Sequence, residues 1–149
     1  MIVRSRAPLR IGLAGGGTDV SPYSDDFGGC ILNASINMYA HTTIEKLESS
    51  SLCTFMAKDI EINDTIDISK DFGLEGPLML HRAVYKRIME QYNNFIFVPV
   101  RVVTYSDAPP GSGLGSSSTM VVSMIEAYKR LLSLPLGEYD VAKLAYQIE

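Results

Sequence analysis

Apolar residues recur at helical spacing in three segments of the second half of the chain. The segment "TMVVSMIEAYKRLLSL" carries six of them on one helical face: Val121, Met124, Ile125, Tyr128, Leu131 and Leu132. The segment "GPLMLHRAVYKRIMEQYNN" carries five: Leu78, Tyr85, Ile88, Met89 and Tyr92. The last segment, "EYDVAKLAYQIE", keeps the spacing after a Pro-Leu-Gly break at Pro135. This periodicity predicts three amphipathic helices, the second opened by Pro77 and closed by Asn93 and Asn94.

Alternation of apolar and polar residues predicts strands in the first half of the chain. Leu9, Ile11 and Leu13 alternate with Arg10 and Gly12, which indicates a half-buried strand that enters a "GGG" turn. Further strands are expected over residues 30–36, 41–47, 52–56 and 60–68. Strands followed by helices, without a linker or an internal repeat, predict one α+β domain over residues 1–149.

One more alternating segment, "NNFIFVPVRVVTYS", precedes a loop rich in glycine and serine. Val98, Val100 and Val102 fall on one face, and Pro99 beside them favours an edge strand or a bulge. The loop "DAPPGSGLGSSSTM" then runs directly into a predicted helix. That helix has three candidate N-caps: Ser116, Ser117 and Ser118.

The order strand, glycine turn, helix start is typical of a phosphate-binding loop. Unpaired N–H groups and the positive end of the helix dipole face whatever the loop encloses. A mobile linker is the alternative, but linkers do not usually run straight into an amphipathic helix. A P-loop is excluded because no lysine precedes the serines, and the dinucleotide fingerprint is excluded because Ser116 stands where it needs glycine.

Composition narrows the class of protein. A net charge of −4 argues against a nucleic-acid-binding surface. No apolar run approaches the length of a membrane span and no signal peptide opens the chain, so we expect no membrane contact and a cytoplasmic location. Cys30 and Cys53 are expected to be free, buried thiols, and His41 and His81 to be structural rather than metal ligands.

Two motifs resemble the GHMP kinases, the small-molecule kinases named after galactokinase, homoserine kinase, mevalonate kinase and phosphomevalonate kinase. "PPGSGLGSSS" is similar to their second signature motif, and "RAPLRIGLAGGGTD" stands about ninety residues earlier, where the family has its first. Within the family, "AGGGTD" followed by "FGGCILNASI" most resembles the sugar 1-kinases that act on D-glycero-D-manno-heptose 7-phosphate. The fucokinase-like branch is the next most similar.

The resemblance implies a fold and an activity. The fold would be the ribosomal-protein-S5-domain-2-like N-terminal domain of these kinases. The activity would be transfer of phosphate from ATP to the anomeric hydroxyl of a sugar. With heptose 7-phosphate the product would be the 1,7-bisphosphate, used for nucleotide-activated heptose and lipopolysaccharide synthesis.

The resemblance also assigns roles within the second motif. The ATP phosphates are expected against Pro110, Gly111, Ser112, Gly113, Leu114, Gly115, Ser116 and Ser117. Mg²⁺ is expected on the Ser117 hydroxyl and the Glu149 carboxylate, which are hard oxygen donors. The alternatives are a helix cap for Ser117 and a solvated helix residue for Glu149.

In the first motif the resemblance places the sugar against Gly15, Gly16, Gly17, Thr18 and Asp19. The Asp19 carboxylate would accept hydrogen bonds from sugar hydroxyls, with a turn residue as the alternative. Arg10 would act as a catalytic residue whose guanidinium neutralises charge on the transferred phosphoryl group, with a surface salt bridge as the alternative. Lys86 and Arg87 are basic candidates for a sugar 7-phosphate, although nothing in their spacing supports that role.

The last helix stops in "KLAYQIE" with its apolar spacing intact and without a glycine or proline exit. The catalytic aspartate and the third glycine motif of the family would follow Glu149. We therefore expect residues 1–149 to be the N-terminal domain of a kinase, without its C-terminal domain. The alternative from another functional class is a non-catalytic module that binds ATP and sugar, such as a pseudokinase or a sensor. Homo-oligomerisation stays open.

Overall fold

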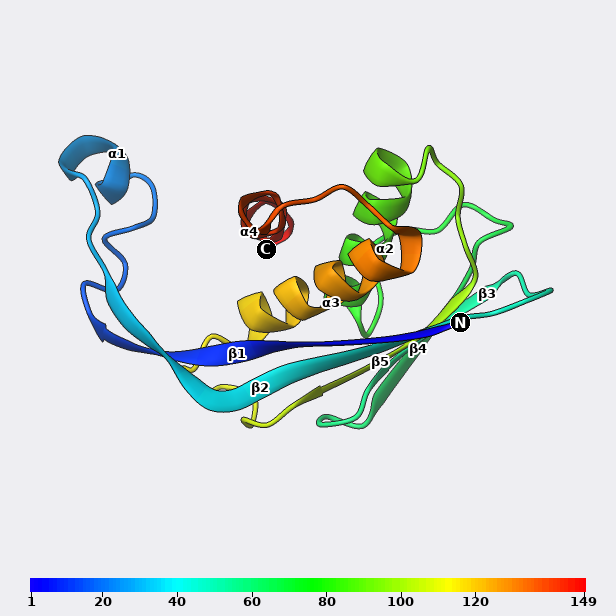
Figure 1. Ribbon diagram of the computed structural model, residues 1–149, viewed down its shortest axis with the longest axis horizontal. Helices are drawn as coiled ribbons and strands as arrows, with labels where there is room; N and C mark the ends of the chain where they lie inside the picture. Colours follow the sequence, from blue (N-terminus) through cyan, green and yellow to red (C-terminus); the bar gives the residue numbers. More distant parts are fainter.

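The computed structural model describes residues 1–149 as a five-stranded sheet with helices on one face (Figure 1). The strands are β1 (Ile2–Ala14), β2 (Leu32–Lys46), β3 (Leu52–Ala57), β4 (Ile62–Asp67) and β5 (Val100–Ser106). The helices are α1 (Tyr23–Phe27), α2 (Met79–Tyr92), α3 (Ser116–Leu132) and α4 (Glu138–Ile148). The predicted α+β class is confirmed.

The spatial order of the strands is β1-β2-β5-β3-β4. Strands β3 and β5 run parallel, and the other neighbours are antiparallel. Helices α2, α3 and α4 cover one face of this sheet, and the opposite face carries no helix (Figure 1). None of the helices has the length and apolar character needed to cross a membrane.

Helix α3 is the centre of the core because its predicted apolar face packs directly on the sheet. Val121, Met124 and Ile125 are fully buried on it. A small residue, Ser123, lets the helix approach the strands closely, and its hydroxyl donates a hydrogen bond of 2.7 Å to Thr42 on β2. The site at the start of α3 is therefore held by a rigid helix.

Two strand predictions are wrong. The expected strands over residues 30–36 and 41–47 are one continuous strand, β2, because it pairs with β1 along most of its length and with β5 from Ala40 onward. Strand β5 is central rather than an edge strand. Pro99 is tolerated because it lies just before the first residue of β5, where its carbonyl accepts a hydrogen bond of 2.9 Å from the Leu47 N–H.

The end of β1 and the start of β2 extend past the other strands. Together with α1, which lies between them in sequence, they form an arm (residues 10–35; Figure 1). Ile11 and Leu13, expected on a half-buried face, are 41% and 60% exposed there. Cys30, expected to be buried, is exposed on the arm, whereas Cys53 is buried in the sheet; both are free thiols. The arm thus exposes apolar side chains to solvent.

Candidate functional site

The 107–115 loop links β5 to α3 in the predicted order. Gly111, Gly113 and Gly115 have φ values of +77°, +73° and +70°, which residues with side chains rarely adopt. A Cβ atom on Gly111 or Gly113 would meet no atom within 4 Å. The backbone of this loop is therefore open to a ligand.

Helix α3 begins at Ser116 with Gly115 as its N-cap, and no side chain caps it. The prediction that a serine caps the helix is therefore wrong, because the three serines form its first turn. The Ser117 hydroxyl is exposed there, next to N–H groups that have no acceptor within the helix. A 17-residue helix that begins in this way favours an anion at its start.

Arg10 lies where the arm meets the 107–115 loop. Its N–H donates a hydrogen bond of 3.2 Å to the Leu114 carbonyl. A Cβ atom on Gly115 would lie 2.3 Å from Arg10 Nη1, so the guanidinium fills the space that a side chain at position 115 would need. Arg10 belongs to none of the six ion pairs of the structure. No carboxylate therefore forms an ion pair with its guanidinium at the start of α3.

The 15–19 loop of the first motif is tied to the segment that follows α1. A Cβ atom on Gly15 would lie only 2.0 Å from the Cys30 carbonyl oxygen. The Thr18 hydroxyl lies 2.7 Å from the Gly15 carbonyl and accepts a hydrogen bond of 3.1 Å from the Cys30 N–H. Gly15 and Thr18 thus shape the loop, while their expected contact with sugar stays a prediction.

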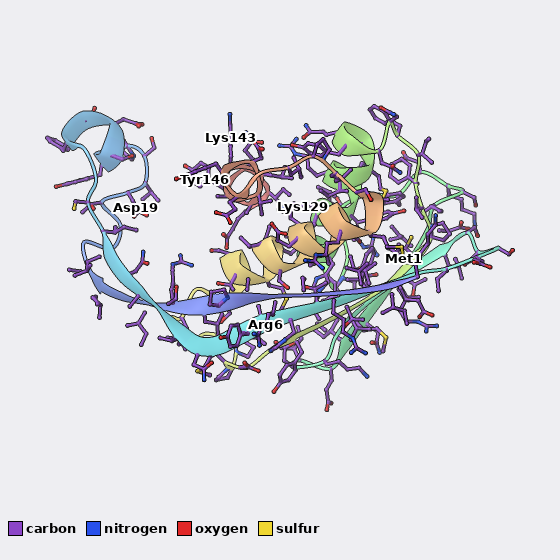
Figure 2. All side chains as sticks on the ribbon, viewed as in Figure 1. Met1, Arg6, Asp19, Lys129, Lys143 and Tyr146 are labelled. Carbon is purple, nitrogen blue, oxygen red and sulfur yellow. The ribbon has the colours of Figure 1, made fainter.

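One hollow of about 240 Å³, the arm hollow, joins the two motifs. Its lining includes Arg10, Gly16, Gly17, Asp19, Gly113 and Gly115. Asp19 is exposed and lies on the arm, between α1 and the sheet (Figure 2). The structure therefore brings Arg10 together with part of the expected sugar loop and part of the expected phosphate loop.

A second hollow of about 270 Å³, the His81 hollow, is also lined in part by the 107–115 loop. Its lining includes Pro110, Gly111, Ser116 and Ser117 from the expected phosphate site. Burial lowers the pKa of His81 to about 4, and its Nε2 lies 2.8 Å from the Thr104 hydroxyl. An apolar hollow with a few polar groups is typical of a small-molecule site.

Other expected residues are not brought to these hollows. Lys86 and Arg87 line a separate hollow between α2 and α4, where neither glycine loop contributes. Glu149 is exposed at the end of α4, and its role as a Mg²⁺ ligand stays a prediction. The chain holds no cluster of three or more His, Cys, Asp or Glu side chains that fits a metal ion.

The sequence analysis missed Asp107, which fixes the start of the 107–115 loop. Its carboxylate accepts a hydrogen bond of 2.8 Å from the Tyr39 N–H, and its own N–H donates one of 3.0 Å to the Tyr39 carbonyl. His41 Nε2 lies 3.4 Å from the same carboxylate. These contacts extend the pairing of β2 with β5 into the loop. The sequence did carry a signal for this role, because Asp107 is an acidic residue that follows a predicted strand and precedes two prolines.

Comparison with known proteins finds relatives at the level of sequence. The family model for the GHMP kinases N terminal domain matches residues 79–149. The chain is 43% identical to the D-glycero-alpha-D-manno-heptose 7-phosphate kinase of Campylobacter jejuni, over 99% of this chain and 43% of that protein. It is 24% identical to a bifunctional fucokinase/GDP-fucose pyrophosphorylase of Arabidopsis thaliana, over 95% of this chain and 14% of that protein.

Solved structures agree with this assignment. A D-glycero-D-manno-heptose 1-phosphate kinase from Bacteroides thetaiotaomicron superposes with a TM-score of 0.91 at 48% identity, over all of this chain and 48% of that one. The mevalonate kinase of Methanococcus jannaschii, at 19% identity and a TM-score of 0.81, shares the fold. The chain spans less than half the length of these relatives. Residues 79–149 match the N-terminal domain of the GHMP kinases, and the whole chain is similar to members of this family in sequence and fold.

Proposed function

We propose that the protein containing this chain is an ATP-dependent sugar 1-kinase, and that its substrate is D-glycero-D-manno-heptose 7-phosphate. One observation carries the proposal: the arm hollow places Arg10 between the loop expected to hold sugar and the loop expected to hold phosphate. Similarity to heptose phosphate kinases over nearly the whole chain supports the choice of sugar.

The 107–115 loop and the first turn of α3 bind the ATP phosphates. Gly111 and Gly113 allow the phosphate oxygens to approach the backbone because no atom occupies the space beside them. The N–H groups at the start of α3 and the exposed Ser117 hydroxyl then donate hydrogen bonds to those oxygens. The largely apolar His81 hollow, which the same loop helps to line, has room for the rest of the nucleotide.

Arg10 stabilises the transition state. The anomeric hydroxyl oxygen forms a bond to the γ-phosphorus of ATP while the bond from that phosphorus to the β,γ-bridging oxygen breaks, and ADP leaves with that electron pair. Negative charge spreads over the transferred group, and a guanidinium without an ion-pair partner at the start of α3 lowers its energy. The proton of the hydroxyl goes to a base, which the family resemblance places beyond residue 149.

Asp19 holds the sugar in the arm hollow. Its exposed carboxylate accepts hydrogen bonds from sugar hydroxyls, and Gly16 and Gly17 leave space beside it because a Cβ atom on either would meet nothing within 4 Å. Asp19 and Arg10 thus bind different parts of the substrate. This separation predicts different kinetic effects for their substitution.

The exposed Ser117 hydroxyl beside the 107–115 loop is an oxygen donor of the kind that Mg²⁺ takes. The ion keeps several waters, takes ligands from substrate phosphates and needs only one or two protein oxygens, so the absence of a cluster of carboxylates is compatible with it. The Ser117 hydroxyl, exposed beside the loop, and the Glu149 carboxylate are the proposed protein ligands. When bound, the ion would neutralise charge on the ATP phosphates.

The test is turnover of the protein expressed at its full natural length. We expect ADP release that depends on both ATP and D-glycero-D-manno-heptose 7-phosphate, with the new phosphate on C1 by ³¹P NMR. Preference for fucose over the heptose would contradict the substrate and keep the sugar 1-kinase class. Binding of ATP and sugar without any turnover would contradict catalysis and favour a non-catalytic binding module.

A further inference from the structure

Asn33 stands where two hollows of the site meet. The first is the arm hollow. The second, of about 230 Å³, lies between the arm and the first turn of α3, and Ser35, Ser118 and Thr119 contribute to its lining. Arg10 and Asn33 are the two residues that line both hollows. Asn33 therefore shares its position with the residue proposed to stabilise the reacting phosphoryl group.

The register of the arm explains this position. Gly12 pairs with Asn33 and Arg10 pairs with Ser35, so Arg10 and Asn33 are diagonal neighbours on one face of the two strands. Side chains in this relation are close enough to contact the same small ligand. A Cβ atom on Gly12 would meet nothing within 4 Å, so the space beside Asn33 is not filled by its cross-strand partner.

Asn33 is also distinct in its chemistry. The arm hollow has three polar side chains in its lining, those of Arg10, Asp19 and Asn33. A guanidinium only donates hydrogen bonds and an ionised carboxylate only accepts them, whereas a carboxamide does both and is neutral. A sugar hydroxyl also donates and accepts. The Asn33 side chain can therefore satisfy both sides of one hydroxyl without repelling the phosphates at the start of α3.

We propose that Asn33 determines sugar specificity by hydrogen bonding the hydroxyl on C2, the carbon next to the anomeric carbon. The assignment rests on the proposed sugar 1-kinase function. The attacking anomeric oxygen lies beside Arg10, because that residue contacts the transferred group. A diagonal neighbour of Arg10 on the same face then meets the hydroxyl on the adjacent carbon. Asp19, on the loop after β1, meets hydroxyls farther along the sugar.

The experiment compares wild-type protein and Asn33→Ala at full natural length with two substrates, D-glycero-D-manno-heptose 7-phosphate and its 2-deoxy analogue. We expect Asn33→Ala to lower kcat/KM for the heptose phosphate about tenfold, chiefly through a higher KM for sugar, with KM for ATP unchanged. The 2-deoxy analogue should react equally well with both proteins, because it lacks the hydroxyl that Asn33 binds.

A matched control lies on the same strand. Asn37 is exposed, four residues along β2, and lines neither hollow, so Asn37→Ala should keep wild-type kinetics. If Asn33→Ala lowers the thermal midpoint, Asn33→Val repeats the test, because valine favours strands and has no side-chain hydrogen-bonding group.

Suppose that the wild-type protein phosphorylates the heptose phosphate. The assignment of Asn33 is then overturned if Asn33→Ala lowers kcat/KM equally for the heptose phosphate and its 2-deoxy analogue, or lowers it for neither. Failure of the wild-type protein itself to phosphorylate the heptose phosphate would instead overturn the proposed function, and the assignment of Asn33 with it.

Discussion

The two glycine loops of the site need glycine for different reasons. In the 15–19 loop, a Cβ atom on Gly15 would lie 2.0 Å from the Cys30 carbonyl oxygen, so glycine lets the loop pack against its own chain. In the 107–115 loop, a Cβ atom on Gly111 or Gly113 would meet nothing within 4 Å, so glycine leaves the backbone uncovered. Glycine thus serves the fold at position 15 and leaves room for a ligand at positions 111 and 113.

The largest effect is expected for Gly113→Val. A β-branched side chain resists the φ of +73° at this position and would fill the space proposed for phosphate, so ATP binding should be lost. Isothermal titration of the folded variant with MgATP measures this. Gly73→Val is the control, because Gly73 has no positive φ and a Cβ atom there meets only Glu75 N at 3.8 Å. Wild-type ATP affinity in folded Gly113→Val would contradict the phosphate site.

Gly15→Ala should damage the fold rather than nucleotide binding. The new methyl group would collide with backbone atoms at a φ of +77°, so we expect a loss of about 2–4 kcal/mol in the free energy of unfolding. Gly16→Ala, with no atom within 4 Å and no positive φ, should cost far less. Urea unfolding and hydrogen exchange of the arm compare the two. Equal stability of both variants would show that Gly15 does not secure the loop.

Asp19→Ala should affect the sugar alone. Loss of a charged acceptor costs about 1.5–3 kcal/mol per hydrogen bond, so use of the heptose phosphate should fall by about tenfold or more, while KM for ATP is kept. Steady-state kinetics with each substrate varied in turn separates these effects. If Asp19→Ala keeps wild-type kinetics for every sugar tried, its carboxylate is only a turn residue.

The smallest effect concerns His81, which lines only the hollow beside the 107–115 loop. Its pKa is about 4 in the folded chain and about 6.5 in the unfolded chain. Between pH 4 and pH 6.5 the unfolded chain therefore binds more protons than the folded chain. Stability should therefore fall as the pH falls from 6.5 toward 4, by about 1 kcal/mol between pH 7 and pH 5.5. Chemical denaturation across this range should show a flatter profile for His81→Gln, and an unchanged profile would contradict this cause.

Residues with a strong local period were predictable from the sequence. The apolar faces of α2, α3 and α4 follow helical spacing and are buried as expected. The continuity of β2 was not predictable, because pairing with β1 and β5 holds together residues whose own pattern breaks near Asn37. Helix α1 was missed because it has five residues and none of them is buried, so it has no apolar face to read.

The site was predictable in its parts and not in its assembly. The glycine motifs indicated a phosphate loop and a sugar loop from their residue types alone. That Gly15 packs on Cys30 while Gly113 stays open depends on the course of the arm, which no local pattern encodes. The contact of Arg10 with Gly115, and the place of Asn33 beside it, come from strand register and from the approach of β1 to α3.

The most direct test of a shared site is a double-mutant cycle between Arg10 and Gly115. Arg10→Ala should lower kcat about a hundredfold with little change in KM for sugar, because its charge acts on the transition state. Gly115→Ala should also lower kcat, because its methyl group needs the space of the guanidinium, 2.3 Å away. The double variant should then be no slower than the slower single variant. Losses that multiply in the double variant would show that Arg10 and Gly115 act independently and that Arg10 does not join the two loops.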